Sequence, residues 1–266
     1  MYTDFNENNI YYDIFGEGKN YILLLHGWGC SGKIFDPVVN LLNKKYKFIV
    51  VDFNGHGRSP EPQKTFYIKD FAEVIYNLLL SLNIDKINII AHSFGARVAI
   101  FLASQHPKLV SKMIITGGAG IILNRNKRFN LKNLSYKFQK NFLNIFRKVN
   151  LFNKQIDNLQ ETLIQKYGSD DYKVLSPGMR KTFIAVVNQD LTGYLKNIVA
   201  STLLIWGNKD TETPIEYAII MNDNIEDSAI ITFENMGHFA FLEDVQRFVA
   251  IADNFFSEEW SWSIYY

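Results

Sequence analysis

Short apolar-rich runs recur along the chain, and each ends in polar or glycine-rich residues. They lie at residues 21–25, 48–51, 87–90, 110–116, 202–206 and 229–233. Such runs are typical of strands that are buried on both faces of a sheet. Between them, residues 35–42, 68–82, 97–104, 214–222 and 242–256 have helical patterns. This alternation predicts an α/β fold with a mostly parallel sheet and helices on both faces, to which residues 10–15 add an edge strand.

The alternation stops between residues 119 and 198, where helical patterns occur without a convincing strand. We therefore expect a core made of residues 1–118 and 199–266 and a helical insertion of residues 119–198. Within the insertion, residues 124–154 hold nine Lys or Arg and no Asp or Glu, beside one apolar helix face. We expect one of two roles for this basic segment. It is either a solvated face in a lysine-rich chain, or it contacts an anionic substrate, an acyl carrier or a membrane surface.

One serine stands where a predicted strand turns directly into a helix, in Ala91-His92-Ser93-Phe94-Gly95. Such a turn brings backbone close to backbone, so only small residues fit two positions before and two positions after it. Ala91 and Gly95 meet this requirement. The spacing predicts a strained Ser93 whose hydroxyl projects from the sheet edge beside a helix N-terminus, as a nucleophile would. The alternative is a serine that merely caps the helix.

A nucleophilic serine needs a base, and the base needs a group that orients it. Because parallel strands end at a common edge, residues just after strands are the candidates. Of the five histidines, only His238 follows a strand late enough in the chain. Asp210, just after a strand end, is the expected orienting acid, with Asp227 and Glu234 as rivals. We expect His26 to brace a glycine-rich loop through hydrogen bonds, and His56, in a turn, and His106, at a helix end, to be structural. His92 is next to Ser93 in the chain, and adjacent residues rarely face each other suitably for proton transfer.

These motifs resemble the α/β-hydrolase fold family, in its small-lid esterase-like branch, over nearly the whole chain. The matching segments are residues 26–29, 52–59, 91–95, 206–207 with Asp210, and 237–238. The resemblance implies a triad in the chain order serine, acid, histidine, and it makes the insertion a lid over the site. Ala91 stands where the family usually has glycine, and Asn54 where proline is common. Neither departure removes a catalytic group.

The expected reaction begins with attack of Ser93 on an acyl carbonyl while His238 takes its proton and Asp210 orients the imidazole. Two amides must stabilise the oxyanion, and we expect these to be Phe94 N at the helix start and Trp28 N between two glycines. The predicted activity is hydrolysis of a carboxylic ester or thioester. Carbon–carbon bond hydrolases, perhydrolases and acyltransferases use the same triad, and a non-catalytic ligand sensor can keep the fold.

Composition and charge restrict the partners and the cellular location that we expect. The net charge is only +1 in 266 residues, so we expect no overall positive electrostatic field that would attract nucleic acid. The single cysteine excludes an internal disulfide, and no apolar run approaches the ~20 residues of a membrane span, so we expect a cytoplasmic protein without a transmembrane segment. No cofactor or metal site is expected.

Two further features of the sequence need an interpretation. Residues 27–33 match the spacing of a phosphate-binding loop, but Ile34 lacks the hydroxyl that would bind magnesium, so a nucleotide site is disfavoured. Residues 260–266 form an aromatic tail to which we assign no role. The oligomeric state is left open.

Overall fold

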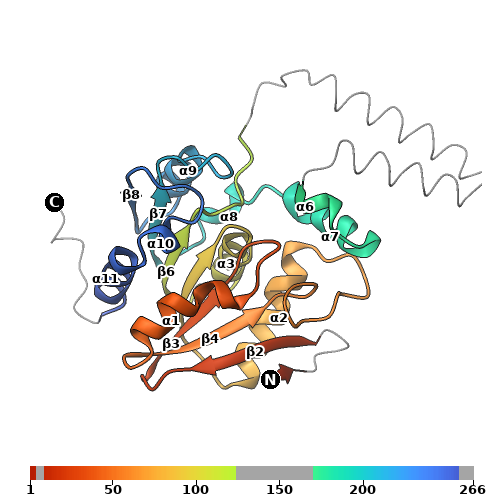
Figure 1. Cartoon of the computed structure of the whole chain (residues 1–266), viewed down its shortest axis with the longest axis horizontal. Coiled ribbons are helices and arrows are strands. Elements are labelled where there is room, and N and C mark those ends of the chain that lie inside the picture. Colours follow the sequence, from red (N-terminus) through yellow and green to blue (C-terminus); the bar gives the residue numbers. More distant parts are fainter. Residues whose placement is uncertain (4–8, 124–169, 258–266) are drawn as a thin grey trace, which may run out of the picture.

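The computed structural model describes residues 1–3, 9–123 and 170–257. Within these ranges the strands form one sheet in the order β1-β2-β4-β3-β5-β6-β7-β8 (Figure 1). The pairs β1–β2 and β2–β4 are antiparallel. Every other pair in this order, from β4–β3 to β7–β8, is parallel. The strands are β1 (Tyr2–Thr3), β2 (Ile10–Phe15), β3 (Asn20–Leu25), β4 (Tyr46–Asp52), β5 (Ile87–His92), β6 (Val110–Thr116), β7 (Ser201–Gly207) and β8 (Ser228–Phe233).

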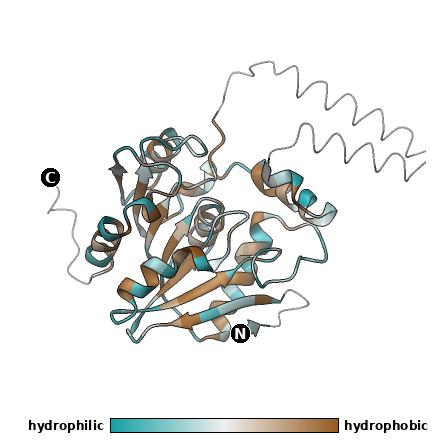
Figure 2. Cartoon of the chain, in the orientation of Figure 1, coloured by the Kyte–Doolittle hydropathy of each residue, from teal (hydrophilic) through white to brown (hydrophobic). Residues whose placement is uncertain are grey.

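Helices cover both faces of this sheet, and the alternation of side chains along the strands separates two cores. In β3, Leu23 and Leu25 belong to the core that α2, α3, α8 and α9 cover, whereas Ile22 and Leu24 belong to the core under α1 and α11. Figure 2 shows the central strands as a continuous hydrophobic part of the ribbon. The helices are η1 (Gly32–Phe35), α1 (Asp36–Leu42), α2 (Ile68–Ser81), α3 (Phe94–Gln105), α6 (Asp170–Lys173), α7 (Pro177–Val187), α8 (Thr192–Leu195), α9 (Glu216–Asn224), α10 (Ala240–Glu243) and α11 (Val245–Phe256).

The predicted α/β class and its mostly parallel sheet are confirmed, with two local differences. β2 is not the edge strand, because β1 pairs with its outer side. The last helix is broken into α10 and α11 at Asp244, whose backbone leaves the helical region at φ −135° and ψ 72°. The Asp244 side chain accepts a hydrogen bond from Arg247 N and so caps α11, which begins directly after the break.

The described part of the predicted insertion, residues 119–123 and 170–198, contains α6, α7 and α8 and no strand. Its limits at residues 119 and 198 stay a prediction. α7 packs on the loop that follows β4: Thr182 Oγ1 accepts a hydrogen bond from Phe66 N at 3.1 Å. The basic segment 124–154, residues 155–169 of the predicted insertion and the aromatic tail lie outside the described residues. Among the helices that are described, none is long and apolar enough to cross a bilayer.

Candidate active site

Ser93 lies between β5 and α3 in a strained backbone conformation, with φ 51° and ψ −112°. A positive φ is costly for a serine and persists only where the surroundings impose it. Here the surroundings leave no space: a Cβ atom at Gly95 would lie 2.1 Å from the carbonyl oxygen of Leu25. The Ser93 side chain makes no capping hydrogen bond to α3. The strained turn is therefore confirmed, and the alternative that Ser93 caps the helix is wrong.

Asp210 and His238 are in direct contact, with 2.8 Å between Asp210 Oδ2 and His238 Nδ1. The turn after β7 holds the carboxylate, because Oδ1 accepts hydrogen bonds from Glu212 N and Thr213 N, each at 2.9 Å. Burial alone raises the pKa of Asp210, but the hydrogen bonds from His238 and Thr213 outweigh burial and hold this pKa below its ordinary value. The side chain at Asp210 is thus a carboxylate that faces the imidazole.

The rival acids lie elsewhere. Asp227 accepts a hydrogen bond from the hydroxyl of Ser201, at the start of β7, and Glu234 accepts one from Asn208. Neither contacts His238 in the described part of the chain. Of the three carboxylates considered from the sequence, the structure brings only Asp210 to the imidazole.

Ser93 and His238 both lie against the end of β6. Ser93 N donates to the carbonyl oxygen of Thr116 at 3.2 Å, and a Cβ atom at the next residue, Gly117, would lie 3.0 Å from His238 Nδ1. The imidazole also packs on His92, with 4.8 Å between ring centroids. The Ser93 hydroxyl makes no hydrogen bond to His238 in this structure. Contacts between a nucleophile and its base are often long before substrate binds.

The turn that contains Trp28 packs against Ser93. A Cβ atom at Gly27 would lie 3.3 Å from Cβ of Ser93, and Gly29 has a positive φ of 74°. Within the described residues, neither Trp28 N nor Phe94 N donates a hydrogen bond to another protein group. This part of the protein therefore leaves both amides unused, which is a condition that the predicted oxyanion site must meet.

The ring of Trp28 connects this turn to the predicted lid. It meets His56, Phe94 and Phe183 in edge-to-face contacts with centroid distances of 4.6, 5.1 and 5.1 Å. Phe183 belongs to α7, so the indole lies between the core and a helix of the insertion. His56, which we expected to be structural, packs on the ring of Trp28.

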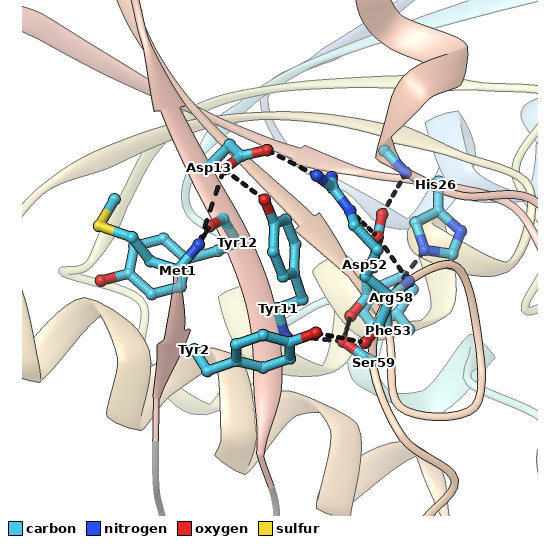
Figure 3. A network of polar contacts seen from close by, with 11 residues as sticks. Met1, Tyr2, Tyr11, Tyr12, Asp13, His26, Asp52, Phe53, Arg58 and Ser59 are labelled. Atoms are coloured by element: carbon cyan, nitrogen blue, oxygen red, sulfur yellow. Dashed lines mark hydrogen bonds and ion pairs between the residues drawn. The ribbon is translucent and has the colours of Figure 1, made fainter.

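Hydrogen bonds of His26 join the same turn to the polar network that Figure 3 shows around Asp52 and Arg58. His26 Nδ1 donates to the carbonyl oxygen of Gly27 at 2.7 Å, and its Nε2 accepts from Phe53 N at 3.0 Å. Burial, with a smaller contribution from neighbouring His56, lowers the pKa of His26 to about 3, so the ring is neutral. The prediction that His26 braces the loop is confirmed.

Asp52, at the end of β4, is the centre of that network. Its carboxylate accepts hydrogen bonds from Gly32 N at 2.8 Å and from Arg58 N at 2.9 Å, and Arg58 also pairs with Asp13 at 3.0 Å. The Gly32 amide, which a phosphate would need, is thus used by a buried protein carboxylate. The phosphate-loop interpretation is not supported.

Two other histidines have structural contacts. His92 Nδ1 donates to the carbonyl oxygen of Thr116 at 3.0 Å, and burial, reinforced by neighbouring His238, lowers its pKa to about 3. His106 stacks on Tyr76 with 3.8 Å between ring centroids. Both histidines lie where the sequence analysis expected no catalytic role.

Two further residues of the Asp210 turn, Glu212 and Thr213, contact the site and were not predicted from the sequence. Thr213 Oγ1 lies 2.8 Å from Asp210 Oδ2 and 2.9 Å from the carbonyl oxygen of Gly117, so it joins the carboxylate to the end of β6. Glu212 Oε2 lies 3.5 Å from His238 Nε2. The polar residues that follow Asp210 directly were the available signal, but nothing in their spacing shows which of them face the imidazole.

Residues 20–245 match the family model described as alpha/beta hydrolase fold. The chain belongs to this family. It is 28% identical over 252 residues to a pimeloyl-[acyl-carrier protein] methyl ester esterase of Legionella pneumophila, covering 93% of this chain and 99% of that protein. It is 26% identical to 2-hydroxy-6-oxononadienedioate/2-hydroxy-6-oxononatrienedioate hydrolase 1 of Pseudomonas putida, covering 90% of this chain and 89% of that protein.

Among solved structures, the esterase EaEST of Exiguobacterium antarcticum superposes with a TM-score of 0.70 at 25% identity, covering 92% of this chain and 94% of that one. The predicted family and the prediction of an enzyme of the hydrolase class are confirmed. The family alone does not assign roles to individual residues.

Proposed function

We propose that this hydrolase cleaves a carboxylic ester or thioester through an acyl-enzyme formed on Ser93, with His238 as base and Asp210 as its orienting acid. The observation that carries the proposal is the 2.8 Å contact of Asp210 Oδ2 with His238 Nδ1. With Nδ1 bound to the carboxylate, Nε2 is the nitrogen left to exchange a proton with the serine. Asp210 then stabilises the imidazolium that forms.

The backbone around Ser93 supplies the second requirement of acyl transfer, which is stabilisation of the oxyanion. We assign this role to Trp28 N and Phe94 N. The first lies in the turn that packs on Ser93, and the second is at the start of α3, where the helix dipole also favours negative charge. Loss of one such donor typically lowers the rate about 100- to 1,000-fold.

The relatives support an ester as the bond cleaved, because the Legionella protein and the Exiguobacterium protein are both named esterases. Carbon–carbon bond hydrolysis is the second candidate, since the Pseudomonas putida relative is named a hydrolase of a dienedioate. We further propose that the enzyme acts in the cytoplasm, which its single cysteine supports. An anionic substrate or carrier at the basic segment 124–154 stays a prediction, because that segment lies outside the described residues.

The test is hydrolysis of a series of p-nitrophenyl esters and acyl thioesters by the wild type and by Ser93→Ala. We expect hydrolysis by the wild type, its loss in Ser93→Ala, and labelling of the wild type alone by a fluorophosphonate probe. Labelling that persists in Ser93→Ala would overturn the assignment of the nucleophile. Turnover of a vinylogous 1,5-diketone without turnover of any ester or thioester would favour the second candidate.

A further inference from the structure

The second nitrogen of the proposed base has its own acidic neighbour. Glu212 Oε2 lies 3.5 Å from His238 Nε2, while Asp210 occupies Nδ1 on the opposite side of the ring. The Glu212 side chain is 66% exposed, whereas the His238 side chain is only 7% exposed. In the described residues this carboxylate forms no ion pair with a lysine or arginine. Its charge is therefore directed at the active site and at solvent.

The position of Glu212 follows from the turn that holds Asp210. Glu212 N and Thr213 N both donate to Asp210 Oδ1 at 2.9 Å. The backbone from which the Glu212 side chain projects is thus tied to the same carboxylate that orients the imidazole. This fixes the point of the backbone from which the carboxylate reaches toward His238.

The proposed reaction places the leaving group beside this charge. In the collapse of the tetrahedral intermediate, Nε2 of His238 gives its proton to the leaving oxygen or sulfur, which must come within hydrogen-bond reach, about 3 Å. Since Glu212 Oε2 is 3.5 Å from the same nitrogen, the leaving atom and this oxygen can be no more than about 6.5 Å apart. That separation is shorter than the Debye length of ~8 Å at physiological salt.

We propose that Glu212 determines the charge preference of the leaving-group side of the site, favouring alcohols that carry a positive charge and disfavouring those that carry a negative charge. This inference rests on the proposed function. Because the carboxylate is exposed, its effect on each charged substrate is modest, about 2- to 5-fold in kcat/KM, and it decreases as salt screens the charge.

The experiment compares three esters of one acyl group. Their leaving alcohols are choline, its uncharged isostere 3,3-dimethylbutanol, and the anion isethionate. The measured quantity is kcat/KM of each charged ester relative to the neutral one, in the wild type, Glu212→Gln, Glu212→Asp and Glu216→Gln. Glu216 is exposed at the start of α9, so its variant changes the net charge equally at a nearby position.

In the wild type we expect the order choline, neutral, isethionate. Glu212→Gln should move both ratios toward 1, Glu212→Asp should keep part of the preference, and Glu216→Gln should match the wild type. The preference of the wild type should also shrink between 0.1 and 1 M salt. Ratios that are equal in the wild type and Glu212→Gln would overturn this inference while Ser93-dependent hydrolysis upholds the proposed function. Absence of Ser93-dependent hydrolysis of these three esters and of every p-nitrophenyl ester and acyl thioester in the series above would overturn both.

Discussion

Gly117 makes room for the imidazole of His238. A Cβ atom at residue 117 would lie 3.0 Å from Nδ1, 3.2 Å from Cε1 and 2.9 Å from the carbonyl oxygen of His238. Gly117 also has a φ of 51°, a conformation that a side chain disfavours. The imidazole of His238 can therefore lie where it does only because residue 117, at the end of β6, has no side chain.

Gly117→Ala should consequently displace the imidazole from Asp210. A displacement of about 1 Å at a reacting group can cost ~100-fold in rate, so we expect a loss of about that size in kcat. Gly193→Ala is the matched control, because no atom lies within 4 Å of a Cβ built at Gly193. Ester hydrolysis and thermal unfolding are measured for both variants. Wild-type kcat in Gly117→Ala would show that the ring tolerates the added methyl group.

Asp210 and Thr213 should differ in the kind of effect that their loss produces. Asp210→Asn removes the charge that selects the histidine tautomer, and we expect kcat to fall by ~10,000-fold. Thr213→Val removes a buried hydroxyl that bonds to the carboxylate, and we expect a loss of about 1.5–3 kcal/mol in unfolding free energy. Urea unfolding and ester kinetics of the two variants check this. Full activity of Asp210→Asn would contradict the proposed acid.

The buried neutral histidines should make the protein less stable in mild acid. The pKa values of His26 and His92 are about 3 in the folded chain, against an ordinary value of 6.5. Between these values the unfolded chain binds more protons, so stability falls as pH falls, by about 1.4 kcal/mol per pH unit for each such histidine. The lowered pKa of Asp210 also stabilises the folded protein, but this contribution is lost only at lower pH, as pH falls through the pKa of Asp210 in the folded chain.

Urea unfolding between pH 7.5 and 5 measures this slope. His26→Gln should reduce the slope by about one proton, even though it also lowers stability at neutral pH. His106→Gln serves as a control, because His106 is more exposed and its pKa is lowered only by partial burial. An unchanged slope in His26→Gln would mean that His26 has the same pKa in the folded protein as in the unfolded chain.

The sequence by itself determined the strands from β2 to β8 and the turn at Ser93, and it placed His238 and the candidate acid Asp210 at one edge of the sheet. Each depends on a local rule or on a rule that holds for all parallel sheets. A continuous apolar run must be buried on both faces, a sharp strand–helix turn admits only small residues near it, and strands end at a common edge. These rules apply before any tertiary contact is known, so the pattern of residues was sufficient.

Only the tertiary structure decided which neighbours complete the site. The carboxyl ends of β6, β7 and β8 lie side by side in the sheet. Gly117, Thr213 and Glu212 therefore contact His238, because all four residues belong to the segments that follow these ends. Nothing in the local pattern distinguishes Glu212, which faces His238 Nε2, from Glu216, which lies four residues later and is also exposed. The direction of an exposed side chain depends on the backbone that carries it, and here hydrogen bonds to Asp210 hold that backbone in place.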